Sequence, residues 1–299
     1  MNQLNKITYE EIEMLNQLQL TELLLMLLRL EANRNSLFQS GIDVPLKIDV
    51  SDGGEDGRIK WHGGSQRTDW IPDRFTIFQC KATKMPAAKC KAEVCKEKSK
   101  ELKDRVKEVL DAGGTYVLFY GRQCNTHHCH PRIKAIRTAI GKSGANYAKT
   151  AKIEIYDAQR IANWCNQYAA AVACVCEGSG FQLPVGLKTW RELANFPDHR
   201  FQFFTNQILD ASIKQLRSAI SQQKAIVRVE GLSGLGKTRL VLEAFRASDT
   251  DLSLQAIRDS VVYCNASILA KEIVVFATDP STLNFQPSTG QRPSARTTK

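Results

Sequence analysis

The sequence predicts an α/β protein built from two unequal parts, and three observations support that prediction. Strand-like and helix-like segments alternate over residues 1–178, which is the pattern of a domain with helices packed on a sheet. Residues 231–238 match the phosphate-binding loop pattern G-x-x-x-x-G-K-[ST], with a predicted strand before them and a predicted helix after them. The formal net charge is +10, and residues 81–150 hold all of that excess, with 16 Lys or Arg against 6 Asp or Glu.

The elements of the N-terminal part follow from hydrophobic periodicity. Residues 8–38 carry a broad leucine-rich face, which predicts one or two helices packed on a sheet. Strands are predicted at residues 41–50, 58–61, 74–80, 116–120 and 152–156, and helices at residues 88–112, 131–140 and 157–173. The segment 74–80 (RFTIFQC) is β-prone and apolar on both faces, so we expect a central strand that is covered on both sides.

Polar side chains stand at the end of this apolar strand. Gln79 and Lys81 share one face with Phe75 and Ile77, because residues two apart in a strand project the same way. Asp56 directly precedes the neighbouring strand, and antiparallel pairing of the two strands would bring the three polar side chains together. A carboxylate, an amide and an ammonium at one place suit phosphodiester hydrolysis. Asp56 and the Gln79 carbonyl would bind Mg²⁺, and Lys81 would orient the attacking water or neutralise phosphoryl oxygens.

These residues resemble a known family. The string Asp52-Gly53-Gly54-Glu55-Asp56-Gly57, followed by Phe78-Gln79-Cys80-Lys81, is similar to the Q-x-K variant of the PD-(D/E)XK restriction-endonuclease-like fold, and to Mrr-type and related anti-phage nucleases in particular. The resemblance covers about residues 20–160. It implies a mixed sheet flanked by helices, a catalytic set of Asp56, Gln79 and Lys81, Mg²⁺ or Mn²⁺ as the cofactor, and double-stranded DNA as the substrate. A helix-borne glutamate often assists in this family, and Glu31 on the first long helix is the candidate. The alternative interpretation is an Asp/Gly turn followed by a strand whose lysine reaches out to solvent.

The phosphate-binding loop predicts nucleotide binding. Backbone N–H groups of such a loop surround the phosphates, and the N-terminus of the following helix adds positive potential. Lys237 would reach the β- and γ-phosphates, and the Thr238 hydroxyl would hold Mg²⁺. The residues predicted to bind ATP are Gly231, Ser233, Gly234, Gly236, Lys237 and Thr238. A structural glycine-rich turn is the alternative.

The loop is also similar to the nucleotide-binding loop of STAND-type NTPases, a branch related to AAA+ proteins. A nuclease joined to a STAND NTPase is the layout of antiviral STAND proteins, in which a C-terminal sensor recognises a phage protein, ATP drives homo-oligomerisation and the nuclease cuts DNA. Only 62 residues follow Lys237, so we expect an NTPase domain that is cut short and lacks the sensor. Residues 273–279 (IVVFATD) fit a Walker B strand only loosely, which leaves ATP hydrolysis by this chain open.

The predicted organisation has four parts. They are a nuclease-like domain at 1–178, a helical linker at 179–222, a partial P-loop domain at 223–279, and a disordered tail rich in Ser, Thr and Pro at 280–299. No apolar stretch is long enough to cross a bilayer, so we expect a soluble cytoplasmic protein without a membrane partner. Nine cysteines without a secretory signal argue against a disulfide framework.

Several interpretations remain open. The basic segment 81–150 favours a polyanion such as DNA, but a solvated lysine-rich helix face accounts for the charge equally well. Residues 124–130 (CNTHHCH) offer soft ligands to zinc, but their spacing matches no strong zinc pattern, which favours a polar loop near the DNA. Two other functions are alternatives to a nuclease. One is a P-loop regulatory protein that binds nucleic acid without chemistry, and the other is an inactive truncated gene product.

Overall fold

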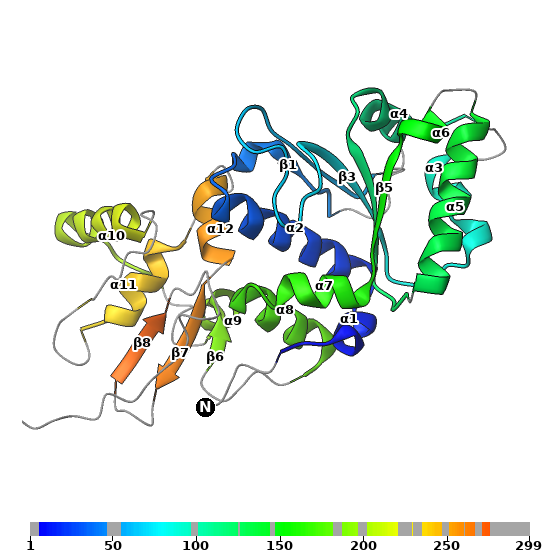
Figure 1. The fold of residues 1–299 in the computed structure, drawn as a ribbon. Coiled ribbons are helices and arrows are strands. Elements are labelled where there is room, and N and C mark those ends of the chain that lie inside the picture. The colour runs from blue at the N-terminus through cyan, green and yellow to red at the C-terminus, as the bar shows by residue number, and fades with distance from the viewer. Residues whose placement is uncertain are drawn as a thin grey trace, which may run out of the picture.

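The structure contains a five-stranded mixed sheet and a smaller three-stranded sheet (Figure 1). It is a computed structural model that describes residues 6–46, 55–96, 101–124, 126–143, 147–181, 187–196, 202–220, 229, 235–246, 251–259, 261–266 and 271–275. The strands of the larger sheet, in spatial order, are β1 (Ile42–Asp43), β2 (Gly57–Lys60), β3 (Phe75–Lys81), β4 (Thr115–Tyr120) and β5 (Lys152–Tyr156). β1, β2 and β3 pair antiparallel, whereas β3, β4 and β5 pair parallel. The predicted α/β class, with a mixed sheet flanked by helices, is confirmed.

β3 occupies the centre of the sheet, as its two apolar faces predict. Phe78 and Cys80 join one hydrophobic cluster, while Phe75 and Ile77 join another on the opposite side of the sheet. The two-residue period of the strand therefore divides its side chains between two cores. Gln79, which projects with Phe75 and Ile77, is only 3% exposed.

Four helices cover the first face of the sheet (Figure 1). They are α1 (Tyr9–Met14), α2 (Gln17–Arg34), α7 (Ala158–Cys165) and α8 (Ala169–Ser179). Thr8 begins α1 and Asn16 begins α2, and each does so through a reciprocal capping box. These two caps explain why residues 8–38 form two helices rather than one.

A cluster of aromatic rings fills the core between these helices and the sheet. Trp164 of α7 is fully buried and stacks on Trp70, with ring centroids 5.9 Å apart. Phe119 of β4 and Tyr156 of β5 meet the Trp164 ring edge-on at 6.5 and 6.1 Å. Edge-to-face and offset-stacked geometries add stability beyond the area that the rings bury, so this cluster ties α7 to two strands.

A second set of helices covers the other face of the sheet, onto which Gln79 projects. They are the 3₁₀ turn η2 (Ala87–Lys89), α3 (Lys91–Val94), α4 (Asp104–Asp111), α5 (Thr126–Lys142) and α6 (Tyr147–Thr150). The single helix predicted at 88–112 is wrong. An antiparallel bridge joins Cys95 to Leu102 and separates α3 from α4. The Lys96 N–H also donates to the Glu101 carbonyl at 2.9 Å, so α3 and α4 are two separate helices. The sequence of residues 97–100 (EKSK) offers no apolar side chain that a continuous helix could bury.

The helix predicted at 157–173 is also interrupted. Asp157 caps α7 as expected, by accepting a hydrogen bond from the Arg160 backbone at 3.0 Å. α7 then ends at Cys165, and α8 begins at Ala169. Between them lies Tyr168, which is buried and donates a hydrogen bond to Glu31 of α2. The turn places this hydroxyl against α2, which an uninterrupted helix would not do.

The C-terminal part departs further from prediction. Its sheet consists of β6 (Leu187–Thr189), β7 (Val262–Ala266) and β8 (Lys271–Val275), all antiparallel. α9 (Trp190–Ala194), α10 (Gln207–Ile220), α11 (Lys237–Ala244) and α12 (Leu252–Asp259) accompany it. The predicted linker 179–222 thus contributes a strand to this sheet. Of the strand predicted at 225–230, all but Val229 lies outside the described residues, as do residues 276–279 of the Walker B candidate.

The predicted helical linker contains two separate helices, α9 and α10, and residues 202–206 before α10 have no regular secondary structure. The apolar side chains of Phe201, Phe203 and Phe204 are most simply interpreted as core residues. In the structure Phe204 is 76% exposed, and Phe203 is half-buried with its ring 5.5 Å from the Arg239 guanidinium. Phe201 lies outside the described residues.

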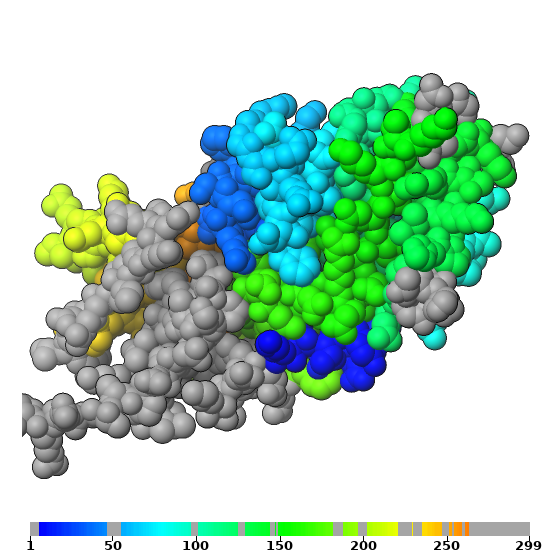
Figure 2. Space-filling model, viewed as in Figure 1, coloured from blue at the N-terminus to red at the C-terminus, as the bar shows by residue number. Residues whose placement is uncertain are grey.

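The C-terminal part packs on the N-terminal part through α12 and α2. The Arg29 guanidinium of α2 donates to the Gln255 amide oxygen of α12 at 3.1 Å. Figure 2 shows the orange atoms of this region beside the blue atoms of the first helices. Among the described helices, none combines the length and the apolar character that a membrane crossing needs.

Candidate active site

Antiparallel pairing of β2 and β3 brings Asp56 and Gln79 together, as predicted. The register sets Gly57 opposite Phe78, which leaves Asp56 facing Gln79 at the end of the ladder. The Asp56 backbone N–H donates to the Phe78 carbonyl at 2.8 Å. The Oδ2 atom of Asp56 then accepts hydrogen bonds from Gln79 Nε2 at 2.5 Å and from the Cys80 backbone N–H at 2.6 Å. The carboxylate is therefore oriented by a side chain and by the strand backbone.

The glycine after Asp56 allows this close approach. A Cβ atom at position 57 would lie 2.9 Å from Val44 Cγ2 and 3.1 Å from Leu24 Cδ2. Side-chain atoms this close would push β2 away from α2. Gly57 thus lets β2 begin against α2 and holds Asp56 at the edge of β3.

Gln17, the first residue of α2, is a member of the site that sequence reasoning missed. Its Nε2 donates to the Cys80 carbonyl at 3.0 Å, and its Oε1 accepts from the Ala82 N–H at 3.1 Å. The Cys80 N–H therefore donates to Asp56, and the Cys80 carbonyl accepts from Gln17. The Gln17 amide thus provides hydrogen-bond partners for the β3 backbone beyond the point where β2 pairs with β3. No local sequence pattern marks this residue, because its partners lie more than 60 positions away.

Lys81 lies at the end of β3 and forms an ion pair with Glu93 of α3. The distance from Lys81 Nζ to Glu93 Oε2 is 3.0 Å, and the side chains are 28% and 15% exposed. Lys81 projects with Gln79 toward the face that α3 covers. Glu93 is thus a second acidic residue near the site, and sequence reasoning missed it as well.

Glu31 is not brought to this site. It lies in the last turn of α2, is 1% exposed, and accepts hydrogen bonds from Tyr168 and from Asn35 Nδ2, the latter at 3.2 Å. Gln17, at the other end of the same helix, is the residue that reaches β3. Fourteen residues of helix separate the two, which is about 21 Å along the axis. Glu31 therefore has a structural role here, as the acceptor of the buried Tyr168 hydroxyl.

The pair of Asp56 and Gln79 fits a hard cation such as Mg²⁺. Gln79 is almost fully buried, and its Oε1 has no hydrogen-bond partner among the described residues. Leaving a buried oxygen unsatisfied costs free energy, and a cation would remove that cost. Carboxylate and amide oxygens are the ligands that Mg²⁺ takes. Across the described part of the chain, His, Cys, Asp and Glu side chains form no metal-binding group of three or more, so the fit rests on this acid–amide pair.

Glu55, next to Asp56, carries a second unsatisfied atom. The residue is 7% exposed, and its Oε2 has no hydrogen-bond partner among the described residues. Its Oε1 lies 3.6 Å from Arg58 Nε. Burial raises the pKa of the Glu55 carboxyl above its usual range, and the Arg58 charge only partly opposes this effect.

Replacing Glu55 with glutamine is expected to stabilise the protein at pH 7.5. A raised pKa means that the folded state binds the proton more tightly than the unfolded state does. The ionised carboxylate therefore destabilises the fold at pH values above the folded-state pKa. Below the unfolded-state pKa of about 4.3 the group is protonated in both states, and this effect is absent. The advantage of the Glu55→Gln protein should therefore disappear near pH 4. Urea denaturation at the two pH values measures it, with Glu10→Gln as a control at an exposed carboxyl. A Glu55→Gln protein that is less stable than wild type at pH 7.5 would contradict this account.

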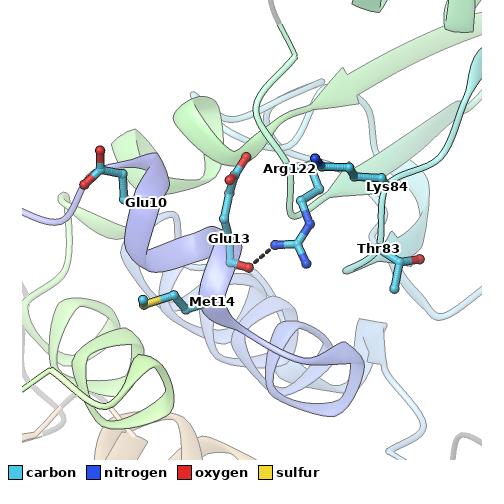
Figure 3. A pocket seen from close by; sticks show the side chains of 6 residues that line it. All are labelled: Glu10, Glu13, Met14, Thr83, Lys84 and Arg122. Atoms are coloured by element: carbon cyan, nitrogen blue, oxygen red, sulfur yellow. Dashed lines mark hydrogen bonds between the residues drawn. The ribbon is translucent and has the colours of Figure 1, made fainter.

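An open hollow of about 550 Å³ lies beyond the end of β3 (Figure 3). Thr83 and Lys84 follow β3 on one wall, and Arg122 follows β4. The Arg122 guanidinium donates to the backbone carbonyl of Glu13, as the dashed line in Figure 3 shows. Glu10, Glu13 and Met14 of α1 complete the lining. The carboxyl ends of parallel strands meet at this edge of the sheet, where α/β proteins commonly bind ligands.

The basic segment forms the helical layer over the face that carries Gln79 and Lys81. Most of its cations are exposed, and they lie on or beside η2, α3, α4, α5 and α6. These exposed residues are Lys84, Lys89, Lys91, Lys96, Arg105, Lys107, Lys134, Arg137, Lys142 and Lys149. The positive charge of the chain thus gathers on the same side of the sheet as the candidate site.

The cysteines of the 124–130 segment are engaged with their own neighbours. Cys129 Sγ donates to the Cys124 carbonyl at 3.1 Å, and Cys124 Sγ accepts from Arg132 Nη1 at 3.6 Å. Burial raises the pKa of the Cys129 thiol to about 12, and the pKa of the nearby Cys90 thiol to about 11. A thiol must lose its proton to bind zinc, so zinc binding here would release protons. The side chains of His127 and His128 lie outside the described residues.

The last residues of the predicted phosphate-binding loop lead into a helix, as expected. α11 begins at Lys237, and Thr238 follows it in the first turn. Gly236 caps the helix in the left-handed region at φ 75°, a conformation that a residue with a Cβ atom rarely adopts. Gly231, Ser233 and Gly234 lie outside the described residues.

No family model matches the chain, and no curated protein or solved structure matches it either.

Proposed function

We propose that this protein is a metal-dependent DNA endonuclease joined to an ATP-binding segment. The observation that carries the proposal is the hydrogen bond between Asp56 and Gln79 at the end of β3, where a buried Gln79 oxygen has no partner among the described residues and Lys81 stands two residues further along the strand. The resemblance to Q-x-K restriction-endonuclease-like proteins supports the same three residues. The resemblance to antiviral STAND proteins supports a role in anti-phage defence, with a phage protein as the trigger and a homo-oligomer as the active form.

Asp56 and Gln79 would hold the cation in this mechanism. A bound Mg²⁺ lowers the pKa of a water molecule and stabilises charge on the phosphate. The hydrogen bond from the Cys80 N–H keeps the Asp56 carboxylate oriented before substrate arrives. Pre-orientation matters because a group that is already in place costs nothing to arrange during the reaction.

Lys81 would stabilise the reacting phosphate rather than act as a base. An ammonium group has hydrogen-bond donors and no acceptor, and the Lys81 ammonium already lies 3.0 Å from the Glu93 carboxylate. In the reaction a water oxygen bonds to phosphorus and one P–O ester bond breaks. One proton of the water passes to solvent, and the leaving oxygen takes a proton from solvent, which gives a phosphomonoester and a free hydroxyl. Lys81 would neutralise the phosphoryl oxygens as their charge develops.

The exposed cations of the helical layer would hold the DNA backbone. Contacts of this kind neutralise phosphates and release counterions, so they depend on salt and read little sequence. The layer covers the side of the sheet to which Lys81 points. This arrangement favours DNA binding over a merely solvated lysine-rich face, because the charge and the site share one surface.

The direct test uses the full chain and a supercoiled plasmid. Cleavage is expected with Mg²⁺ or Mn²⁺ and should stop when EDTA is added. Cutting that survives EDTA would point to a contaminant or to another mechanism. Plasmid binding without cutting in either metal would favour a regulatory protein that binds nucleic acid without chemistry.

Replacing Lys237 with alanine is expected to abolish most ATP binding. Lys237 stands at the N-terminus of α11, where a phosphate would meet the helix dipole and the lysine charge together. Equilibrium binding of a fluorescent ATP analogue measures the effect, and a loss of affinity of about 100-fold or more is expected, equivalent to about 2.7 kcal/mol. Lys214→Ala, on α10, is the control. Equal affinity of the Lys237→Ala and wild-type proteins would show that the loop does not bind the nucleotide.

A further inference from the structure

We propose that Glu93 is a positioning residue, which holds the Lys81 ammonium where the scissile phosphate arrives. The inference rests on the proposed nuclease function and names a residue that the family resemblance does not supply. Its basis is the 3.0 Å contact between Glu93 Oε2 and Lys81 Nζ, beside the buried Gln79. Glu93 itself would not touch the DNA.

A lysine at the end of a strand needs such a partner. The Lys81 side chain has four rotatable bonds and a compact charge, so its ammonium can occupy many positions around the strand end. One carboxylate on the covering helix restricts Nζ to the side of the sheet on which Gln79 also lies. Fixing the ammonium before substrate binds removes an entropic cost from the reaction step.

Other contacts already hold α3 in place. Cys90 and Val94 are fully buried, and Val94 accepts a hydrogen bond from the Lys103 N–H at 2.9 Å. The bridge between Cys95 and Leu102 also holds the C-terminal end of the helix. The Glu93 carboxylate is therefore not needed to place α3 on the sheet, and its removal should leave the fold intact.

The negative charge of Glu93 allows an effect on the position of Lys81 to be distinguished from an effect on DNA binding. A carboxylate beside a basic surface repels phosphate, so removing it should leave DNA affinity unchanged or increase it. If Glu93 positions Lys81, the same removal should slow cleavage. A slower chemical step together with undiminished DNA affinity is a result that general loss of structure would not produce.

The test compares Glu93→Gln, Glu93→Asp and Glu154→Gln with wild type in single-turnover plasmid cleavage and in DNA binding. Glu93→Gln is expected to lower the cleavage rate constant 10- to 100-fold, since a misplacement of about 1 Å near the chemistry can cost 100-fold. Glu93→Asp should recover part of the rate, because it keeps the charge on a shorter side chain. Glu154 pairs with Arg160 at 2.8 Å on β5, away from the site, so Glu154→Gln should cleave within twofold of wild type.

A second measurement does not depend on cleavage. NMR signals of lysine ammonium groups appear when an ion pair slows their exchange with water. A Lys81 signal, assigned by its loss in Lys81→Ala, should be present in wild type and absent in Glu93→Gln. Thermal unfolding should give a similar Tm for both proteins.

The outcomes distinguish the inference from the function that it rests on. If wild type cleaves and Glu93→Gln cleaves equally fast, the positioning role is overturned and the nuclease stands. If Glu93→Gln loses DNA binding or a large part of its stability together with cleavage, Glu93 is structural and the inference is overturned. If wild type does not cleave with any metal, the nuclease fails and the inference fails with it.

Discussion

Replacing Lys81 with alanine is expected to reduce the cleavage rate constant by about 100- to 1000-fold, which is the usual cost of removing one group that stabilises transition-state charge. The reason is the position of Lys81, at the end of the central strand and two residues from the buried Gln79. DNA affinity should change little, because Lys81 is one cation among many on this surface. Its loss should lower the slope of log K against log salt concentration by about one unit. Single-turnover cleavage and a salt titration of DNA binding measure the two effects.

Lys60 provides the matched control. It stands on β2 opposite Phe75, at the other end of the same strand pair, with its Nζ 4.7 Å from the Phe75 ring centroid. Lys60→Ala removes the same charge and the same number of atoms far from Asp56. It should cleave at the wild-type rate. If Lys81→Ala also cleaves at the wild-type rate, the assignment of the site is wrong.

Replacing Trp164 with alanine is expected to destabilise the N-terminal part by about 3–5 kcal/mol, the range for large aromatic residues removed from a core. The ring is fully buried and contacts three other aromatic rings, from the loop before β3, from β4 and from β5. Its removal would leave a cavity that these rings cannot close without losing their own contacts. Because whole domains are stable by only about 5–15 kcal/mol, the loss should be visible as a large fall in Tm.

Trp164→Phe separates the aromatic contacts from the volume. Phenylalanine keeps a ring between Trp70 and Tyr156 and should lose much less stability than alanine does. Urea denaturation followed by circular dichroism measures both variants. A Trp164→Ala protein that unfolds within about 1 kcal/mol of wild type would show that the aromatic cluster does not stabilise the fold as its burial suggests.

The meeting of Asp56 and Gln79 was predictable because it depends on strand geometry alone. The two-residue period fixes which face Gln79 and Lys81 share, and antiparallel pairing places the start of β2 beside the end of β3. The central position of β3 was predictable for a similar reason, since its sequence is apolar on both faces. These predictions required no knowledge of how the helices pack.

The predictions that failed depend on helix placement. Glu31 and Gln17 lie on the same helix, and only the packing of α2 decides which end meets the site. Glu93 was not identified because its segment was expected to continue as one long helix, whereas α3 ends at Val94 and sets Glu93 against Lys81 at the end of β3. In each case the deciding contact joins residues far apart in the sequence, or depends on a helix end that local propensity does not specify.

The hydrogen bond from the Cys80 N–H to Asp56 has a consequence for variation at the middle position of the Q-x-K motif. Because the donor is a peptide nitrogen, the acid is anchored by the main chain and not by the thiol. Any amino acid except proline offers the same N–H, so chemistry at position 80 imposes no choice of side chain. The Cys80 side chain is fully buried between α2 and the sheet, so the size of the side chain at this position is limited instead. The motif can thus tolerate exchange among small apolar residues at its centre while its two polar neighbours stay fixed.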